Sequence, residues 1–172
     1  MRRGVFSCLL LFLALSGFAQ AQQRPGSVLT LGSQVPDFRF SATPDSMTHL
    51  AAYRGNVILL NFFATWCPPC NAEFPHLEKE IWAQYKDRPD FVLLAFGREH
   101  NWKEVKAFAK QKQVTFPVYP DPYRNVFKLF AQAYIPRNVV INAEGKIIYE
   151  SIGYKPREFE RLKTLLDKQL DL

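Results

Sequence analysis

The pattern of apolar and polar positions in the first half of the chain predicts strands that alternate with helices. Two continuous apolar runs, 57–64 and 91–96, have the length of strands buried on both faces, as in a parallel sheet covered by helices. Apolar residues that recur every three or four positions predict amphipathic helices over 71–85 and 102–109. Pro75 is expected to kink the first of these helices.

The second half of the chain continues this pattern. Its expected elements are an extended segment over 114–119, a short helix over 123–131, strands over 139–142 and 146–150, and a closing amphipathic helix over 159–170. The short glycine-containing loop 143–145 makes the two strands an antiparallel hairpin. Phe38, Phe40 and Leu50 add a short strand and turn near the N-terminus. This order predicts an α/β domain with a mixed central sheet and helices on both faces.

The first 21 residues have the pattern of a secretory signal peptide. Two arginines precede an apolar run over 5–15, and the small-x-small sequence Ala19-Gln20-Ala21 follows. The run is shorter than the ~20 residues that usually cross a bilayer, so we expect cleavage after Ala21 and no stable membrane insertion afterwards. The protein is then exported to the periplasm or another extracytoplasmic space. We expect residues 22–33 to be a flexible leader and 34–172 to be the folded domain.

Composition narrows the class of protein. Apolar residues make up 48% and charged residues 22% of the 172 residues, which is typical of a globular domain and excludes disordered, collagen-like and disulfide-dense chains. The formal net charge is +6, and two of the positive charges lie in the expected signal peptide. Lys and Arg form no run with interleaved aromatic residues, so we expect no nucleic-acid partner.

Two of the three cysteines carry the candidate chemistry, because Cys8 would leave with the signal peptide. A disulfide between Cys67 and Cys70 would add little stability to the fold, because the two residues are so close in sequence. Two cysteines separated by two residues after a buried strand are instead a redox signature. A helix N-terminus stabilises an anion, which lowers the pKa of Cys67 and makes it the expected exposed nucleophile. Cys70, one turn later, is the resolving thiol, and Trp66 gives the reactive sulfur an apolar rim for substrate.

Other kinds of site fit these residues less well. Zinc requires four protein ligands, or three and a water, and only His76 and His100 lie downstream as candidates. Haem attachment requires a histidine where Asn71 stands. A peroxidatic site also fits less well, because Thr65 stands two residues before Cys67 and no proline lies where a peroxiredoxin signature requires one. A thiol peroxidase and a copper(I) metallochaperone stay as alternatives. We expect no metal and no bound cofactor, because the cysteine pair itself carries two electrons.

The run from Asn61 to Cys70, with Glu73 and Pro75 after it, resembles the exported thioredoxin-like proteins of the TlpA/ResA group. The resemblance extends through Ile135-Pro136 and the following hairpin. It implies a thioredoxin fold with extra N-terminal strands and an inserted helix, and a cis peptide bond at Pro136 opposite the cysteines. It also implies that Ile135 pairs its backbone with a substrate strand, that the substrates are protein disulfides, and that a membrane-delivered reductant supplies electrons.

One position departs from thioredoxin itself, which carries a buried aspartate six residues before its first cysteine. Asn61 stands there, so the proton of the resolving thiol needs another acceptor. Glu73 lies three residues after Cys70 on the same helix face, and the TlpA/ResA group has an acid at this place. Our hypothesis is that Glu73 accepts or tunes this proton, with a pKa raised by partial burial.

The two prolines between the cysteines predict the direction of electron flow. Neither Pro68 nor Pro69 can donate a backbone N–H to the Cys67 sulfur, so the thiolate is less stabilised. A less stabilised thiolate favours the disulfide and lowers the reduction potential, which predicts a reductant.

The remaining candidates are expected to be ordinary surface residues. We expect His49, His76 and His100 at the surface, and Arg137 as a solvated arginine and not a substrate contact.

Overall fold

The computed structural model describes residues 24–171. The expected signal peptide, residues 1–21, therefore lies outside the described residues. Within residues 24–171, no helix is long and apolar enough to cross a membrane.

A mixed five-stranded sheet in the order β5-β4-β3-β6-β7 forms the centre of the domain. Its strands are β3 (Val57–Phe63), β4 (Phe91–Arg98), β5 (Val118–Asp121), β6 (Arg137–Ile141) and β7 (Ile147–Ile152). The first three are parallel, while β6 runs antiparallel to both β3 and β7. Both predicted apolar runs and the antiparallel hairpin are confirmed. Every residue of β3 is buried, as expected for a central strand covered on both faces.

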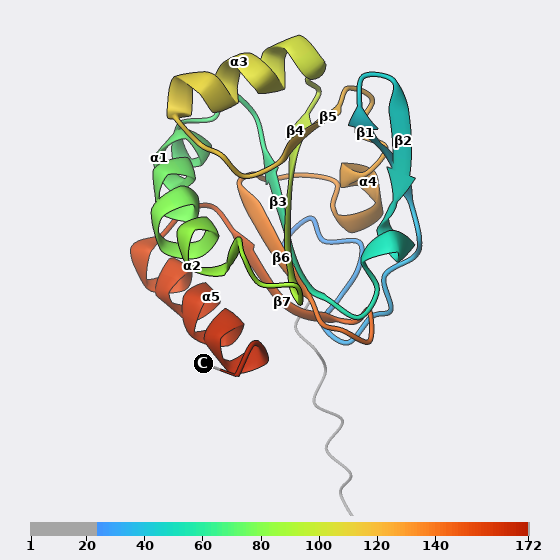
Figure 1. Ribbon diagram of the computed structural model, residues 1–172, viewed down its shortest axis with the longest axis vertical. Coiled ribbons are helices and arrows are strands. Elements are labelled where there is room, and N and C mark those ends of the chain that lie inside the picture. Colours follow the sequence, from blue (N-terminus) through green and yellow to red (C-terminus); the bar gives the residue numbers. More distant parts are fainter. Residues whose placement is uncertain (1–23, 172) are drawn as a thin grey trace, which may run out of the picture.

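Helices cover both faces of the sheet (Figure 1). One face carries α1 (Pro68–His76), the π-helical turn η2 (Leu77–Trp82), α2 (Ala83–Tyr85), α3 (Trp102–Lys112) and α5 (Pro156–Gln169). The other face carries the hairpin of β1 (Arg39–Thr43) and β2 (Ser46–His49), the 3₁₀ turn η1 (Leu50–Tyr53) and the short helix α4 (Phe127–Phe130). The predicted helices on both faces and the additional N-terminal strands are thus present.

Two predicted helices have different bounds in the structure. The helix expected over 71–85 begins at Pro68 and widens into a π-helical turn just after Pro75, whose missing N–H removes one helical hydrogen bond. The helix expected over 123–131 is only the single turn α4. The carboxylate of Asp121 accepts the backbone N–H groups of Val126 and Phe127, at 3.2 and 2.8 Å, and so sets where this turn begins.

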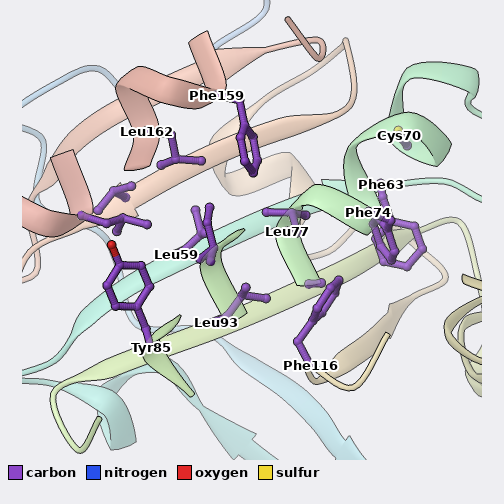
Figure 2. Close-up of a cluster of buried hydrophobic side chains, with 14 of the residues drawn as sticks. Leu59, Phe63, Cys70, Phe74, Leu77, Tyr85, Leu93, Phe116, Phe159 and Leu162 are labelled. Atoms are coloured by element: carbon purple, nitrogen blue, oxygen red, sulfur yellow. The ribbon is translucent and has the colours of Figure 1, made fainter. Parts of the chain in front are cut away.

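The side chains of β3 alternate between two apolar cores. Leu59 and Phe63 face the layer of α1, α3 and α5, whereas Leu60 and Phe62 face the hairpin and α4. Figure 2 shows the first core, in which Cys70 lies at the end of the cluster where Phe63 and Phe74 pack. The second cysteine of the motif is therefore part of a hydrophobic core.

The segment that we expected to be a flexible leader makes backbone hydrogen bonds with the domain from Gly26 onward. The N–H of Val28 donates to the carbonyl of Phe130 at 2.8 Å, and the N–H of Gln132 donates to the carbonyl of Gly26 at 2.8 Å. These bonds hold the segment beside the loop that leads into β6.

The structure contradicts the prediction that Arg137 is solvated. Its side chain is completely buried and forms an ion pair with Glu150. It also donates to Oγ of Ser27 at 2.8 Å and to the carbonyls of Pro25 and Ala133, at 3.1 and 2.8 Å. The prediction failed because the guanidinium finds its partners in distant parts of the sequence, and these partners satisfy a charge that burial would otherwise make unfavourable.

Candidate active site

Cys67 and Cys70 form a disulfide at the start of α1. Cys67 is the N-cap residue, Pro68 and Pro69 occupy the first two helical positions, and the N–H of Cys70 donates to the Cys67 sulfur at 3.4 Å. A helix start tolerates prolines because its first amides have no helical partner. The local sequence thus places the first sulfur at the positive end of the helix dipole.

The two cysteines differ in their access to solvent. Cys67 is 3% exposed and Cys70 is completely buried. The expectation of an exposed Cys67 is therefore wrong for the oxidised protein. Cys67 nevertheless keeps a small accessible surface, whereas Cys70 is completely enclosed, so Cys70 cannot be the first of the two to meet an incoming thiolate or disulfide.

The loop before β6 lies directly against Cys67. The peptide bond between Ile135 and Pro136 is cis, as the resemblance implied. The carbonyl oxygen of Ile135 is 3.7 Å from the Cys67 sulfur, and Ile135 is half-buried while Pro136 is buried. The structure therefore brings these two residues, 68 and 69 positions after Cys67 in sequence, to the sulfur.

Trp66 forms a projecting edge of the site. Its side chain is 61% exposed, and the guanidinium of Arg98 stands 5.7 Å from the centre of its ring. A cation at this distance from an aromatic ring is attracted to it. The indole thus remains available to a partner while Arg98 limits its orientation.

Glu73 lies in α1 three residues after Cys70, in a buried polar cluster, and its burial is nearly complete. Nδ2 of Asn61 donates to one carboxylate oxygen at 3.0 Å, and Nδ2 of Asn138 donates to the other at 2.6 Å. Burial raises the pKa of Glu73 to about 7, although the hydrogen bonds from Asn138 and Asn61 act in the opposite direction. A carboxyl group with this pKa can take up or release a proton near neutral pH.

Asn138 is a site residue that the sequence analysis missed. It stands directly opposite Asn61 in the register of β3 and β6, and Nδ2 of Asn61 also donates to its Oδ1 at 2.8 Å. The available signal was a polar residue in the apolar strand two positions after Pro136. The role of Asn138 depends on the pairing of β6 with β3, which the pattern of apolar and polar residues does not predict.

His100 is also wrongly predicted as a surface residue, since it is 4% exposed. Its Nε2 accepts the backbone N–H of Thr65, one residue before Trp66, at 2.9 Å. Burial lowers the pKa of His100, so the neutral form that can accept this bond is favoured at neutral pH. Within the described chain, no three His, Cys, Asp or Glu side chains are grouped so that they could hold a metal ion.

Comparison with known proteins places these features in a family. The family pattern described as Redoxin matches residues 30–166. The thioredoxin-like protein YneN of Bacillus subtilis is 38% identical over 137 residues, which cover 79% of this chain and 79% of YneN. The thiol-disulfide oxidoreductase ResA of Bacillus thuringiensis subsp. konkukian is 28% identical over 130 residues, which cover 76% of this chain and 74% of ResA.

A solved structure gives the same picture of the fold. It is the solution structure of a Bacteroides thetaiotaomicron protein provisionally described as a protein disulfide isomerase, with 37% sequence identity and a TM-score of 0.81. The match covers 86% of this chain and 94% of that protein. Together with the family pattern, it confirms the thioredoxin-like fold.

Proposed function

The chain belongs to the Redoxin family, and from that premise we propose that it reduces protein disulfides outside the cytoplasm. It is a thiol-disulfide oxidoreductase of the ResA/TlpA type, with Cys67 and Cys70 as its redox pair. The observation that supports this function most directly is the position of the pair. Cys67, which keeps a small accessible surface, caps a helix, and the completely buried Cys70 is bonded to it.

The reaction begins with the reduced pair. The Cys67 thiolate attacks one sulfur of a substrate disulfide, and the other substrate sulfur leaves as a thiolate that takes up a proton. Cys70 then loses its proton and attacks the Cys67 sulfur of the mixed disulfide, which releases the second substrate sulfur. Two electrons pass to the substrate, and the protein is left with the Cys67–Cys70 disulfide.

We assign substrate contact to Trp66, Ile135 and Pro136. The Ile135 carbonyl lies 3.7 Å from the Cys67 sulfur, so an extended substrate segment that pairs with the Ile135 backbone would bring its own sulfur to Cys67. Exposed Trp66, the residue before Cys67, supplies apolar surface at the site. Backbone pairing accepts many sequences, which suits a reductase with several protein substrates.

Electrons flow from the dithiol to the substrate, because the two prolines leave the Cys67 thiolate with few hydrogen bonds. Pro68 and Pro69 have no backbone N–H to donate. In the first turn of α1 the N–H of Cys70 is the group that donates to the Cys67 sulfur. A thiolate with little stabilisation makes the dithiol the stronger reductant. Oxidised protein would regain its electrons from a membrane-delivered reductant, and the signal peptide that directs export would be removed by cleavage after Ala21.

The reduction potential tests this direction. We expect equilibration with glutathione to give a value nearer the about −270 mV of thioredoxin than the about −120 mV of a strongly oxidising disulfide donor. The matched variant Pro69→Ala restores one backbone N–H near the sulfur and is expected to raise the potential. A wild-type value near −120 mV would contradict the reductase assignment and leave the oxidoreductase chemistry in place.

We also propose that Glu73 accepts the proton of Cys70 in the second step. The Glu73 carboxyl is ionised above pH 7 and protonated below it, so the rate of resolution should rise as the pH increases through about 7. Glu73→Gln removes this acceptor. We expect the resolution step to slow by roughly 10²-fold at pH 8 and to lose its inflection near neutral pH.

Stopped-flow mixing of the reduced protein with excess substrate disulfide, between pH 5 and pH 9, checks this prediction, because the phase that does not depend on substrate concentration reports the resolution step. Glu144→Gln is the matched control, because Glu144 is an exposed glutamate in the hairpin loop. The control is expected to keep the wild-type profile. If Glu73→Gln kept it as well, Glu73 would have no part in the proton transfer.

A further inference from the structure

His100 touches the active-site turn, yet no step of the proposed reaction uses it. The residue follows the end of β4, and its imidazole is buried beside the ring of Phe63, with the ring centres 6.4 Å apart. From this position Nε2 accepts the N–H of Thr65 at 2.9 Å. A nitrogen that accepts carries no proton, so the neutral ring has its proton on Nδ1, which lies 3.8 Å from a carboxylate oxygen of Glu104.

Asn71 holds the same turn from the opposite side. It lies in the first helical turns of α1, and its Nδ2 donates to the carbonyl of Thr65 at 2.8 Å and to the carbonyl of Cys67 at 2.9 Å. The N–H of Cys67 itself donates to the carbonyl of Ala64 at 3.2 Å. Both polar backbone groups of Thr65 are thus bonded to side chains, one from the end of β4 and one from α1.

Gly97 gives His100 the room to reach the turn. A Cβ atom at this glycine would lie 2.5 Å from a side-chain carbon of Val105 and 3.3 Å from the Cβ of His100. The first distance is too short for any real side chain. The missing side chain therefore allows α3 and His100 to pack closely under the turn.

This support acts where burial does not hold the turn, since Cys67 is buried and bonded to Cys70 whereas Trp66 is exposed. Trp66 points outward with 61% of its surface exposed, so its side chain does not fix the backbone by burial. Attack of a thiolate on a disulfide depends on a near-linear approach, and a misplacement of about 1 Å can cost up to ~10²-fold in rate.

We propose that His100 and Asn71 are positioning residues that hold the Thr65–Cys67 turn in the geometry for attack by Cys67. The proposal rests on the proposed function, because it assigns them no chemistry of their own. They act through the two sides of the Thr65 backbone, and the feature of His100 that matters is a hydrogen-bond acceptor at the place of Nε2.

The test compares variants that keep and remove this acceptor, each in a Cys70→Ser background with a free Cys67 thiol. His100→Gln retains an acceptor oxygen, whereas His100→Leu fills similar volume without one. Asn71→Ala removes the second half of the support at a partly exposed position, so it answers the question even if His100→Leu fails to fold. His49→Leu is the control, because His49 is an exposed histidine in β2. The measurements are Cys67 alkylation by iodoacetamide and hydrogen exchange at the Thr65 amide.

We expect His100→Leu and Asn71→Ala to slow alkylation about tenfold, and His100→Leu to speed exchange at Thr65 about tenfold. His100→Gln and His49→Leu are expected to stay within about twofold of the parent. Equal alkylation rates in His100→Leu and the parent would overturn the proposal, as would a His100→Gln variant as slow as His100→Leu. Alkylation needs no protein substrate, so a failure of the proposed reductase function would appear separately, as absent disulfide reduction by the wild-type protein.

Discussion

Cys67→Ser is expected to lower the rate of disulfide reduction by at least about 10³-fold, to the rate of dithiothreitol alone. A hydroxyl at this position cannot form the mixed disulfide, and Cys70 cannot replace it because that sulfur is completely buried. Reduction of insulin, followed by the turbidity of its precipitating chains, checks the loss of activity.

The companion variant Cys70→Ser should behave differently, although it is also inactive over many turnovers. Cys67 can still attack, but nothing inside the protein displaces the captured substrate. A mixed disulfide should therefore accumulate with Cys70→Ser and be absent with Cys67→Ser, as intact-protein mass spectrometry would show. Equal trapping by the two variants would contradict the assigned roles. Rapid reaction with hydrogen peroxide in place of insulin reduction would instead favour a thiol peroxidase.

Arg137→Ala should lower the free energy of unfolding by about 3–5 kcal/mol. The substitution leaves the carboxylate of Glu150 buried without its cationic partner, and it also removes the donors that bind the carbonyls of Pro25 and Ala133. For a domain of this size we expect the melting temperature to fall by roughly 10 °C. Urea denaturation followed by circular dichroism measures the change.

A double-mutant comparison separates the buried charge from simple loss of packing. Arg137→Met combined with Glu150→Gln removes both charges, and it should destabilise the protein less than Arg137→Met alone. Arg157→Ala is the control, because Arg157 is an exposed arginine at the start of α5, and its effect should stay within about 0.5 kcal/mol. If Arg137→Ala cost no more than this control, the buried ion pair would not be a stabilising element.

The features that local sequence predicts well are those that depend on neighbouring residues. The all-buried strand β3 follows from a continuous apolar run, because burial on both faces requires apolar residues at consecutive positions. The helix after the cysteines follows from the spacing of its apolar residues, although the two prolines occupy its first positions and it begins at Pro68, before the expected residue 71. The cis peptide bond before Pro136 was predicted from the family resemblance, because the local sequence alone does not distinguish a cis from a trans proline.

The errors occur where burial depends on partners far away in the chain. Arg137 and His100 are polar residues that most proteins expose, and each is buried because distant groups bond to it. Asn138 was overlooked for a related reason, since it becomes a site residue only when β6 pairs with β3 and brings it opposite Asn61. Such contacts are set by the topology of the sheet, whereas periodicity reports only which face of an element is apolar.

The burial of Cys70 within the core shown in Figure 2 has a kinetic consequence. In the proposed reaction, substrate and electron donor react in turn at Cys67, so they exclude one another. The enzyme should therefore shuttle between two stable forms with ping-pong kinetics and never hold both partners in a ternary complex. Small thiols in the surroundings would be unable to react directly with the buried Cys70 sulfur.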